Sequence, residues 1–295
     1  MLSVRFASDN RTEPLAFDDM AATRQIRSAR GEVLEPEVAA KLLMVPWYNL
    51  YTSMPDWPLP PSSKRPHIKT SRLVLKPLQL SDLEALHALR TQPEVMEKTF
   101  RPRVDRDLDE TRTLLQSLQE PEDGNSWRYG VFLASTGELI GDGGVYSYDD
   151  LWRTGWPELE CMLRKEHWGQ GLGKELMLAL VDAWFALPRS GVKKHMLHPN
   201  VIGELEPGDE LPDNLTIIFE SSIDAARKIV DGMTHPKSDY IADWQQIDWR
   251  EGKEYQDVTL AGWLVPNPHG LDPYRTDSGS LSDRTDVEED DEEES

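Results

Sequence analysis

The sequence has one cysteine in 295 residues, Cys161, so an intrachain disulfide framework is excluded. It also lacks any apolar run of about 18 residues, the length that a helix needs to cross a bilayer, and no apolar stretch of the signal-peptide kind lies near its start. We therefore expect no membrane span and a reducing compartment, the cytoplasm first and the nucleus as the alternative.

Basic residues are also few, with 32 Lys and Arg against 53 Asp and Glu and a formal net charge of −21. Nucleic acids and anionic membranes attract proteins through Lys and Arg, so general binding to either is excluded. The acidic excess is strongest from Asp272 to Ser295, where 11 acids and two bases predict a disordered tail. That tail is either a solubilising spacer or a binding segment for a basic protein partner.

The residues that bind metals or act as nucleophiles form no recognisable pattern. His195, His198 and His235 lack the spacing of metal ligands, so we expect no metal site. Cys161 lies in an apolar stretch, and among the histidines only His167 is near it in the sequence. We therefore expect Cys161 to be a buried structural thiol, although a nucleophilic role stays open.

Composition divides the chain into three segments. We expect an N-terminal extension over residues 1–66, a compact domain over residues 67–265 with an acidic insertion at about 190–213, and a disordered acidic tail over residues 266–295. The extension contains a short helix candidate at 37–44 and a proline-rich connector at 55–61, which we expect to be extended.

Hydrophobic periodicity within the domain predicts a mixed sheet with helices on its faces. Alternating patterns indicate strands at 68–78, 127–134, 138–148, 158–163, 215–219 and 257–265. A capping box at Ser81 to Glu84, with Leu80 as its staple, predicts a helix with Leu83, Leu86 and Leu89 inward. Further helices are expected at 108–118, after residue 173, and from a cap at Ser221 or Ser222 to Gly232.

Three glycines in five residues, Gly169, Gly171 and Gly173, stand between the strand at 158–163 and an amphipathic helix. Glycine adopts positive φ without strain, and the unpaired N–H groups of a helix's first turn carry partial positive charge. The pattern predicts a site for a pyrophosphate that needs no basic side chain. It equally fits a turn that only packs a helix closely against a sheet.

Four stretches of the chain resemble the GNAT superfamily of acyl-CoA-dependent N-acyltransferases, and most of all its RimJ/RimL-type branch. They cover residues 70–86, 126–146, 157–177 and 221–233. The third is the most specific, because Glu158, Trp168, Gly169, Gly171 and Glu175 fall at the family's spacing. The resemblance implies an α/β (α+β) fold with a mixed, mostly antiparallel sheet, which is splayed at the acyl-CoA site and carries helices on both faces.

The resemblance also implies which residues bind the donor substrate, acetyl-CoA. Backbone amides of the glycine turn would hold its pyrophosphate, and the preceding strand would pair with its pantetheine arm. The turn residues are Trp168, Gly169, Gln170, Gly171, Leu172, Gly173 and Lys174, and the strand residues are Cys161, Met162 and Leu163.

Acetyl transfer to an amine needs a base, because only a neutral amine attacks a thioester. The resemblance makes Glu158 the candidate base, and Glu160 points to the same face of the strand two residues later. A backbone N–H near Met162 would meet the oxyanion, and Ser222 would donate to the leaving thiolate. Solvent exposure alone also explains the two glutamates, and helix capping alone explains Ser222.

One departure from the family pattern leaves the function open. The family usually has Asn three residues before the helix serine, where this chain has Phe219. The first hypothesis is an acetyl-CoA-dependent N-acetyltransferase that acts on a primary amine, either a protein N-terminus or a small cationic amine. The alternatives are a non-catalytic protein that binds acyl-CoA and an interaction protein that works through its acidic tail.

Overall fold

The structure is a computed structural model that describes residues 48–99, 103–146, 154–197, 208–233, 238–247 and 257–269. The helix expected at 37–44, residues 270–295 of the expected acidic tail and part of the expected acidic insertion lie outside the described residues. The expected tail boundary at 266 is too early, because a strand runs over Asp257–Pro266 and Asn267 is buried and donates to Asp213. No helix in the described ranges is long and apolar enough to cross a membrane.

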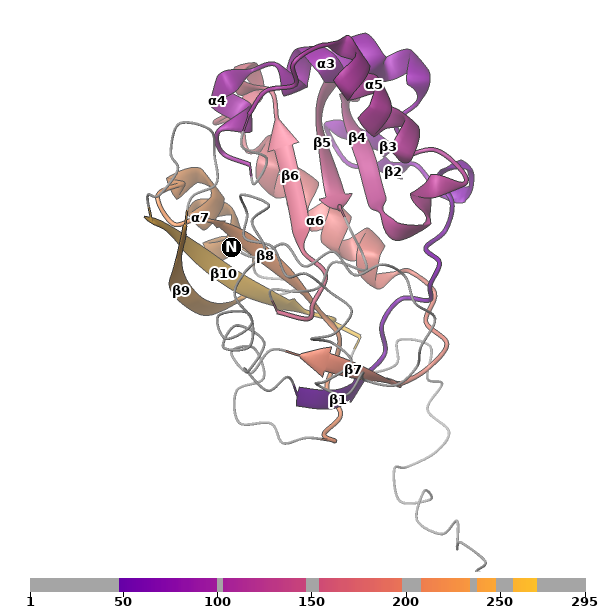
Figure 1. The fold of residues 1–295 in the computed structure, drawn as a ribbon, viewed down its shortest axis with the longest axis vertical. Coiled ribbons are helices and arrows are strands. Elements are labelled where there is room, and N and C mark those ends of the chain that lie inside the picture. Colours follow the sequence, from indigo (N-terminus) through magenta and orange to yellow (C-terminus); the bar gives the residue numbers. More distant parts are fainter. Residues whose placement is uncertain are drawn as a thin grey trace, which may run out of the picture.

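The larger sheet has five strands, and each neighbouring pair is antiparallel (Figure 1). Its order is β2 (Ile68–Lys69), β3 (Leu73–Lys76), β4 (Trp127–Leu133), β5 (Leu139–Val145) and β6 (Leu159–Leu163). The expected alternation is visible in β3, where Leu73 and Leu75 are fully buried and the residues after them are half-buried.

A second sheet is built from β8 (Asn214–Glu220), β10 (Asp257–Pro266) and β9 (Asp239–Ile247), also antiparallel. It meets the larger sheet at a parallel bridge between Glu158 and Thr216, where the Thr216 N–H donates to the carbonyl of Pro157 at 2.9 Å. Beyond this bridge β6 pairs with β5 and β8 pairs with β10, and the two strands diverge (Figure 1). The expected mixed, mostly antiparallel and splayed sheet is confirmed.

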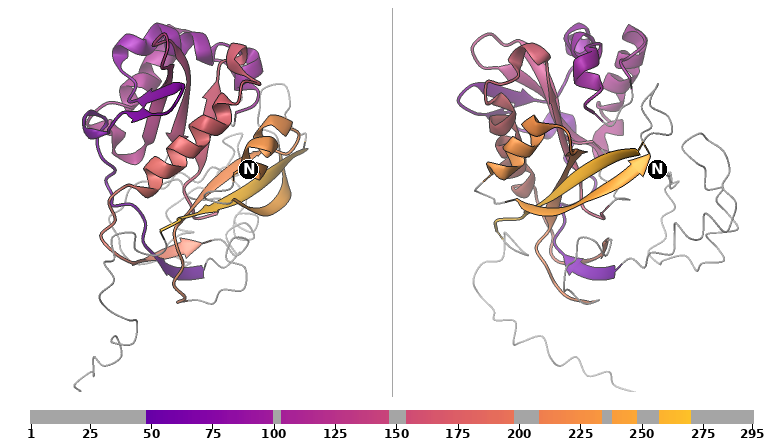
Figure 2. Two further views of the ribbon diagram at one scale, coloured as in Figure 1. Left: turned by 180° about the vertical axis from the view of Figure 1, so that it is seen from behind. Right: turned by 90° about the vertical axis from the view of Figure 1, so that its left-hand side faces the viewer.

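Helices cover both faces of the larger sheet (Figures 1 and 2). One face carries α3 (Leu83–Arg90), α4 (Pro93–Met96) and α5 (Leu108–Ser117), and the opposite face carries α6 (Leu172–Phe185). A further helix, α7 (Asp224–Asp231), packs beside α6 and the second sheet. The apolar stripe of α6 is fully buried at Leu176, Leu180, Val181 and Trp184, so α6 forms the centre of the main core.

Residues ahead of the expected domain start also pack onto the domain. β1 (Tyr48–Thr52) pairs antiparallel with β7 (Lys193–Leu197), and Leu50 is fully buried beside Trp156. Leu59, in the expected connector, is 1% exposed and belongs to the main core. Neither strand was expected, because β1 lies in the presumed extension and β7 begins with two exposed lysines.

Two details of the first helix were predicted wrongly. The capping box joins Gln79 and Asp82 around the 3₁₀ turn Leu80–Asp82, and α3 then begins at Leu83 with Asp82 as its N-cap, one residue later than a box at Ser81 would place it. Leu80, the expected staple, is 53% exposed. The predicted inward face of α3 is confirmed, since Leu83, Leu86 and Leu89 are buried.

Candidate functional site

The glycine turn follows a short 3₁₀ turn, η4 (Lys165–His167), and ends in the first turn of α6. Gly169 has φ 73° and Gly171, the N-cap of α6, has φ 75°, so both need the left-handed conformation that glycine adopts most easily. Gly173 serves packing, because a Cβ there would lie 3.0 Å from Cδ1 of Ile229 in α7. The packing interpretation therefore applies to Gly173, whereas Gly169 and Gly171 shape the turn itself.

The backbone amides of residues 169–174 have no acceptor among the described residues, and the first helical bond of α6 is from the Glu175 N–H to the Gly171 carbonyl, at 3.3 Å. Gly169, Gln170 and Gly171 are exposed. Free amides at the positive end of a helix dipole attract anions. The turn can therefore bind a diphosphate through its backbone alone.

Glu175 fixes this turn to the start of β3, more than a hundred residues away in the chain. Its carboxylate accepts hydrogen bonds from the Thr70 hydroxyl at 2.5 Å, the Ser71 hydroxyl at 3.0 Å, and the Arg72 N–H and Nε at 2.9 and 2.7 Å. Arg72 Nη1 donates in turn to the Gln170 carbonyl at 2.8 Å. The sequence pattern marked Glu175 as a family position but did not reveal this partner.

The pKa of Glu175 reflects the same contacts. Burial alone would raise the pKa, but hydrogen bonds from Thr70, Arg72 and Ser71 outweigh burial and lower the pKa to about 2. Glu175 is therefore ionised at every physiological pH, and Arg72 offsets its charge at the end of the helix where an anion would bind.

Trp168 closes the turn onto β6. Its indole Nε1 donates to the Leu163 carbonyl at 2.8 Å, and the Lys98 ammonium lies 5.9 Å from the ring centroid. The side chain is 40% exposed, so Trp168 belongs to the surface of the site and not to the core.

The ladder between β5 and β6 determines which amides of β6 are available to a ligand. The Arg164 N–H donates to the Ile140 carbonyl at 2.7 Å, and the register places Met162 opposite Asp142. Because hydrogen-bonded pairs alternate in an antiparallel ladder, the amide of Met162 faces β5, whereas those of Cys161 and Leu163 face the opposite edge. The amide of Met162 is therefore not available for the oxyanion contact expected near it, whereas those of Cys161 and Leu163 point away from β5.

The two candidate carboxylates lie on the face of the sheet that α3 and α5 cover. Met162 packs in the α3 and α5 cluster, whereas Leu159 and Leu163 pack in the main core, so successive side chains of β6 alternate between the faces. Glu160 thus shares the face of Met162, as does Glu158 two residues earlier in the same extended run, and both are half-buried. The structure places both carboxylates beside the diverging edge of β6.

A buried polar cluster on the same face was missed by sequence reasoning. Arg128 forms an ion pair with Asp142, whose other oxygen accepts a hydrogen bond from the Tyr146 hydroxyl at 2.7 Å. The Arg128 Cζ lies 3.8 Å from the centroid of the Tyr146 ring, and Asp142 is fully buried. The sequence offered one sign of this cluster: Asp142 stands between two glycines inside an otherwise apolar strand.

Burial and neighbouring carboxylates keep the other two titratable groups of this region protonated. Burial, followed by the charge of Asp142, raises the pKa of Tyr146 well above its usual value. Cys161, expected to be buried, is half-buried and packs against the main core. Burial of its thiol raises the pKa of Cys161 to about 12, with further contributions from Asp142 and Glu160. A neutral thiol is a poor nucleophile, which argues against covalent catalysis by Cys161.

Ser222 lies between β8 and α7, exposed to solvent, and its hydroxyl donates to Oε1 of Glu220 at 2.8 Å. The helix cap predicted at Ser221 or Ser222 is wrong, because Ile223 is the N-cap of α7 and no side chain caps that helix. Helix capping therefore does not explain the presence of Ser222.

The histidines considered for metal binding have other partners or lie outside the described residues. His195 Nε2 lies 2.7 Å from the Gly155 carbonyl, and burial lowers its pKa. Within the described ranges, no group of three or more His, Cys, Asp and Glu side chains could hold a metal ion.

Comparison with known proteins identifies the part of the chain that contains this site. Residues 72–202 match the family model described as "Acetyltransferase (GNAT) domain". A curated relative, the uncharacterized N-acetyltransferase p20 of Bacillus licheniformis, is 28% identical over 117 residues. That match covers 39% of this chain and 64% of the relative, which is less than two thirds of the relative's length.

Solved structures with a similar arrangement include three acetyltransferases. A GNAT-family acetyltransferase from Bacillus anthracis is 13% identical, with a TM-score of 0.48, over 68% of this chain and 99% of its own. The spermidine N-acetyltransferase from Vibrio cholerae, in complex with CoA and spermine, is 19% identical, with a TM-score of 0.46, over 66% and 97%. An acetyltransferase from Salmonella typhimurium that modifies the N-terminal serine of ribosomal protein L7/L12 is 15% identical, with a TM-score of 0.43, over 67% and 98%.

The glycine turn, the strand before it and the two carboxylates all lie within the matched residues. Residues 72–202 of this chain are therefore similar to a GNAT acetyltransferase domain.

Proposed function

We propose that this chain is an acetyl-CoA-dependent N-acetyltransferase that transfers the acetyl group directly from the thioester to a primary amine. The observation that carries the proposal is the row of amides at residues 169–174, which have no acceptor in the described part of the chain. The match of residues 72–202 to the GNAT domain model supports the same conclusion.

The residues present fit acetyl-CoA as the acyl donor. The amides of residues 169–174 would hold the diphosphate, with Trp168 at the start of the turn. The pantetheine arm would pair with the edge of β6 to which Cys161 and Leu163 direct their amides, next to Met162. The bound thioester supplies the acetyl group, and the protein supplies its orientation.

The acceptor amine has to lose protons at the site. An amine like that of lysine, with a pKa near 10.4, is neutral in only about 1 molecule in 2,500 at pH 7, a cost of ~4.6 kcal/mol, whereas an α-amine near 7.8 loses only about 1 kcal/mol. We assign the base to Glu158, with Glu160 as its neighbour on the same face. A carboxylate base is most needed if the acceptor is a small cationic amine.

The transfer balances without a further reactant. The amine lone pair attacks the thioester carbonyl carbon to form the C–N bond, and an amide of Cys161 or Leu163 stabilises the oxyanion. The C–S bond then breaks and the amine proton passes to Glu158, while the leaving thiolate accepts a hydrogen bond from a hydroxyl, for which Ser222 is the candidate. The proton held by Glu158 then passes through solvent to the thiolate, which restores the carboxylate base.

The charge on the acceptor side supports a cationic acceptor. In the described part of the chain, Glu158, Glu160 and Asp142 share a face with the guanidinium of Arg128, which pairs with Asp142. The excess of carboxylates attracts either a protein N-terminus or a small cationic amine. We propose both classes as acceptors to be tested.

A non-catalytic protein that binds acyl-CoA is the second candidate. It is favoured by the exposed position of Ser222, which hydrogen-bonds to Glu220, and by Phe219 at the place of the family's asparagine. In that case the glycine turn would bind CoA, but no amine would be acetylated.

Thiol release from acetyl-CoA, followed with DTNB, tests the proposal. The acceptor panel contains spermine, lysine, and peptides with serine, alanine or methionine at the N-terminus. We expect turnover with at least one acceptor, a large loss of kcat in Glu158→Gln, and little change in Glu84→Gln, an exposed carboxylate on α3. Calorimetric binding of CoA without turnover of any acceptor would favour the second candidate, and absence of CoA binding would refute both.

A further inference from the structure

The 3₁₀ turn η4, which precedes the glycine turn, is bound by the side chain of Gln92 at the start of α4. With α3 and α5, α4 covers the face of the sheet on which Glu158 and Glu160 lie, called the acceptor side below. The carbonyl Oε1 of Gln92 accepts a hydrogen bond from the backbone N–H of Lys165 at 3.0 Å. Its amide Nε2 donates to the carboxylate of Glu166, at 3.0 Å to Oε2 and 3.2 Å to Oε1. Both ends of the Gln92 amide are therefore bound to η4.

Two further contacts run between the same segments. Lys165 Nζ lies 2.7 Å from Oε1 of Glu94, and the Lys98 ammonium lies 5.9 Å from the Trp168 ring centroid. The ion pair is exposed, and exposed pairs of this kind contribute little. Gln92 differs because one of its bonds is to the backbone, whose position sets the start of the glycine turn.

Gln92 stands on a short and rigid piece of chain. It is the N-cap of α4, Pro93 fills the first position of that helix, and the Thr91 hydroxyl donates to the His87 carbonyl at 2.7 Å. A proline at this position fixes the backbone angle φ. A displacement of Gln92 is therefore passed to α4 and not absorbed by a flexible linker.

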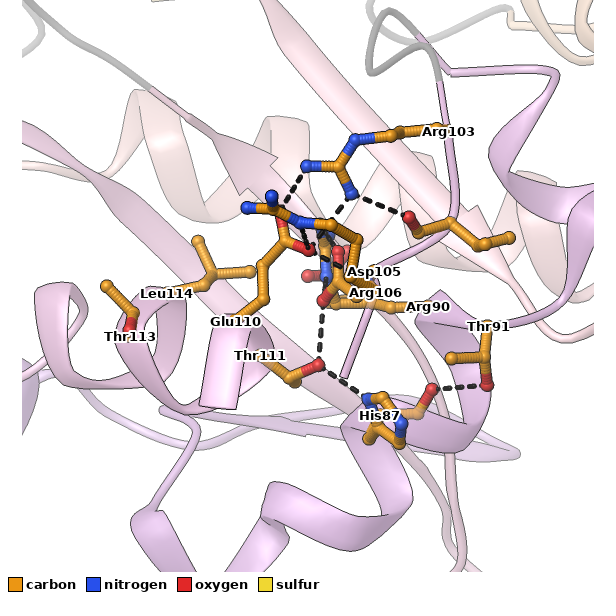
Figure 3. Close-up of polar contacts among 12 residues, drawn as sticks. His87, Arg90, Thr91, Arg103, Asp105, Arg106, Glu110, Thr111, Thr113 and Leu114 are labelled. Atoms are coloured by element: carbon orange, nitrogen blue, oxygen red, sulfur yellow. Dashed lines mark hydrogen bonds and ion pairs between the residues drawn. The ribbon is translucent and has the colours of Figure 1, made fainter. Parts of the chain in front are cut away.

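Behind this segment, a buried polar network joins α3 to α5 (Figure 3). Arg90 donates from Nε and Nη2 to the two oxygens of Asp105, both at 2.7 Å, and the Asp105 N–H donates to the Arg90 carbonyl. Thr111 donates to Asp105 at 2.7 Å, so its hydroxyl accepts from Nδ1 of His87, also at 2.7 Å. The two helices therefore behave as one unit.

This unit borders the face on which Glu158 and Glu160 lie. Val95 and Met96 of α4 pack in the same buried cluster as Met162 of β6, with Leu86 and Leu89 of α3. A shift of α4 relative to η4 therefore changes the packing next to the candidate acceptor site.

We propose that Gln92 is a positioning residue that couples cofactor binding at the glycine turn to the helices of the acceptor side. The proposal rests on the proposed function, because it takes CoA as the ligand of the turn. A diphosphate held by the amides of residues 169–174 restrains η4, and Gln92 passes that restraint to α4. Because coupling between two sites is reciprocal, an acceptor that restrains α4 would tighten CoA binding by the same factor by which CoA tightens binding of that acceptor.

Hydrogen exchange measured by mass spectrometry, with CoA alone as the ligand, tests this inference. In the wild type we expect CoA to slow exchange at residues 165–175 and also, by about fivefold, at residues 92–99, a factor at the low end of known couplings. In Gln92→Ala and Gln92→Glu the protection at 165–175 should remain, whereas that at 92–99 should disappear. Gln116→Ala, on the exposed side of α5, is the matched control and should behave as wild type.

The possible outcomes separate the two proposals. Protection of 165–175 without any change at 92–99 in the wild type overturns the coupling and leaves the proposed function standing. Protection of 92–99 that persists in both Gln92 variants shows that another contact carries the coupling, and overturns the role of Gln92. No protection at 165–175 refutes the proposed cofactor site itself. Thermal unfolding of each variant identifies any general loss of structure.

Discussion

Replacement of Glu175 by glutamine tests whether the hydrogen bonds between Glu175 of α6 and residues 70–72, just before β3, stabilise the fold. The carboxylate accepts bonds from two hydroxyls, one backbone N–H and one guanidinium, all from residues 70–72. Glutamine keeps one acceptor oxygen, but its NH₂ group then faces donors that it cannot pair with. Glu175→Gln therefore removes the charge and leaves part of this donor set without an acceptor.

The pKa of Glu175 gives the size of the expected loss of stability. A pKa of about 2 in place of the usual 4.5 corresponds to ~3.4 kcal/mol of stabilisation of the folded state at neutral pH. The side chain keeps 15% of its surface exposed, so screening by solvent reduces the expected value to about 2 kcal/mol. Because the folded-state pKa is the lower one, this stability is complete above pH 4.5 and is lost as the pH falls toward 2.

Urea unfolding at a series of pH values measures both effects. At pH 7 we expect the free energy of unfolding of Glu175→Gln to be about 2 kcal/mol below that of the wild type. As the pH is lowered from 4.5, the wild type should lose this advantage and the two curves should converge, since the variant has no group to titrate at this position. Glu84→Gln, an exposed carboxylate on α3, serves as the control and should follow the wild type.

Equal stability of Glu175→Gln and wild type at pH 7 would refute this reasoning. A constant difference across the acid range would also refute it, because the loss would then come from packing and not from the ionised carboxylate.

Three other changes give distinct expected results. Gly171→Ala forces a side chain into φ 75°, so CoA affinity measured by calorimetry should fall with only about 1 kcal/mol lost in stability. Asp142→Asn leaves Arg128 buried without a counter-charge and should cost about 3 to 5 kcal/mol in denaturant unfolding. Cys161, with a pKa raised to about 12, should resist iodoacetamide at pH 8 in native protein and react after unfolding, as mass spectrometry would detect. Unchanged CoA binding in Gly171→Ala would contradict the first expectation, and near-wild-type stability of Asp142→Asn the second. Rapid alkylation of Cys161 in the native protein would contradict the third.

Where sequence reasoning failed, a competing contact decided the outcome. The capping box formed between Gln79 and Asp82, around a 3₁₀ turn, in place of the box expected at Ser81, so that Asp82 became the N-cap of α3. The strand β9 was missed because its sequence, DYIADWQQI, alternates poorly and carries two aspartates. Its pairing with β10 supplies what its own composition does not.

The glycine turn and the inward face of α3 could be predicted from the sequence because they depend on neighbours within a few residues. Positive φ at Gly171 and the spacing of Leu83, Leu86 and Leu89 are local properties of the chain. The same holds for the alternation that puts Glu158 and Glu160 on one face of a strand.

Tertiary structure alone decided what these local pieces contact. Glu175 meets Arg72 across 103 residues and Gln92 meets Glu166 across 74, and no periodicity in the sequence relates such positions. The register between β5 and β6 likewise turned the amide of Met162 away from the open edge and directed those of Cys161 and Leu163 toward it. Local conformation follows from backbone sterics and the nearest side chains, whereas distant partners are set by the packing of the whole core, which selects among many pairings that the sequence allows.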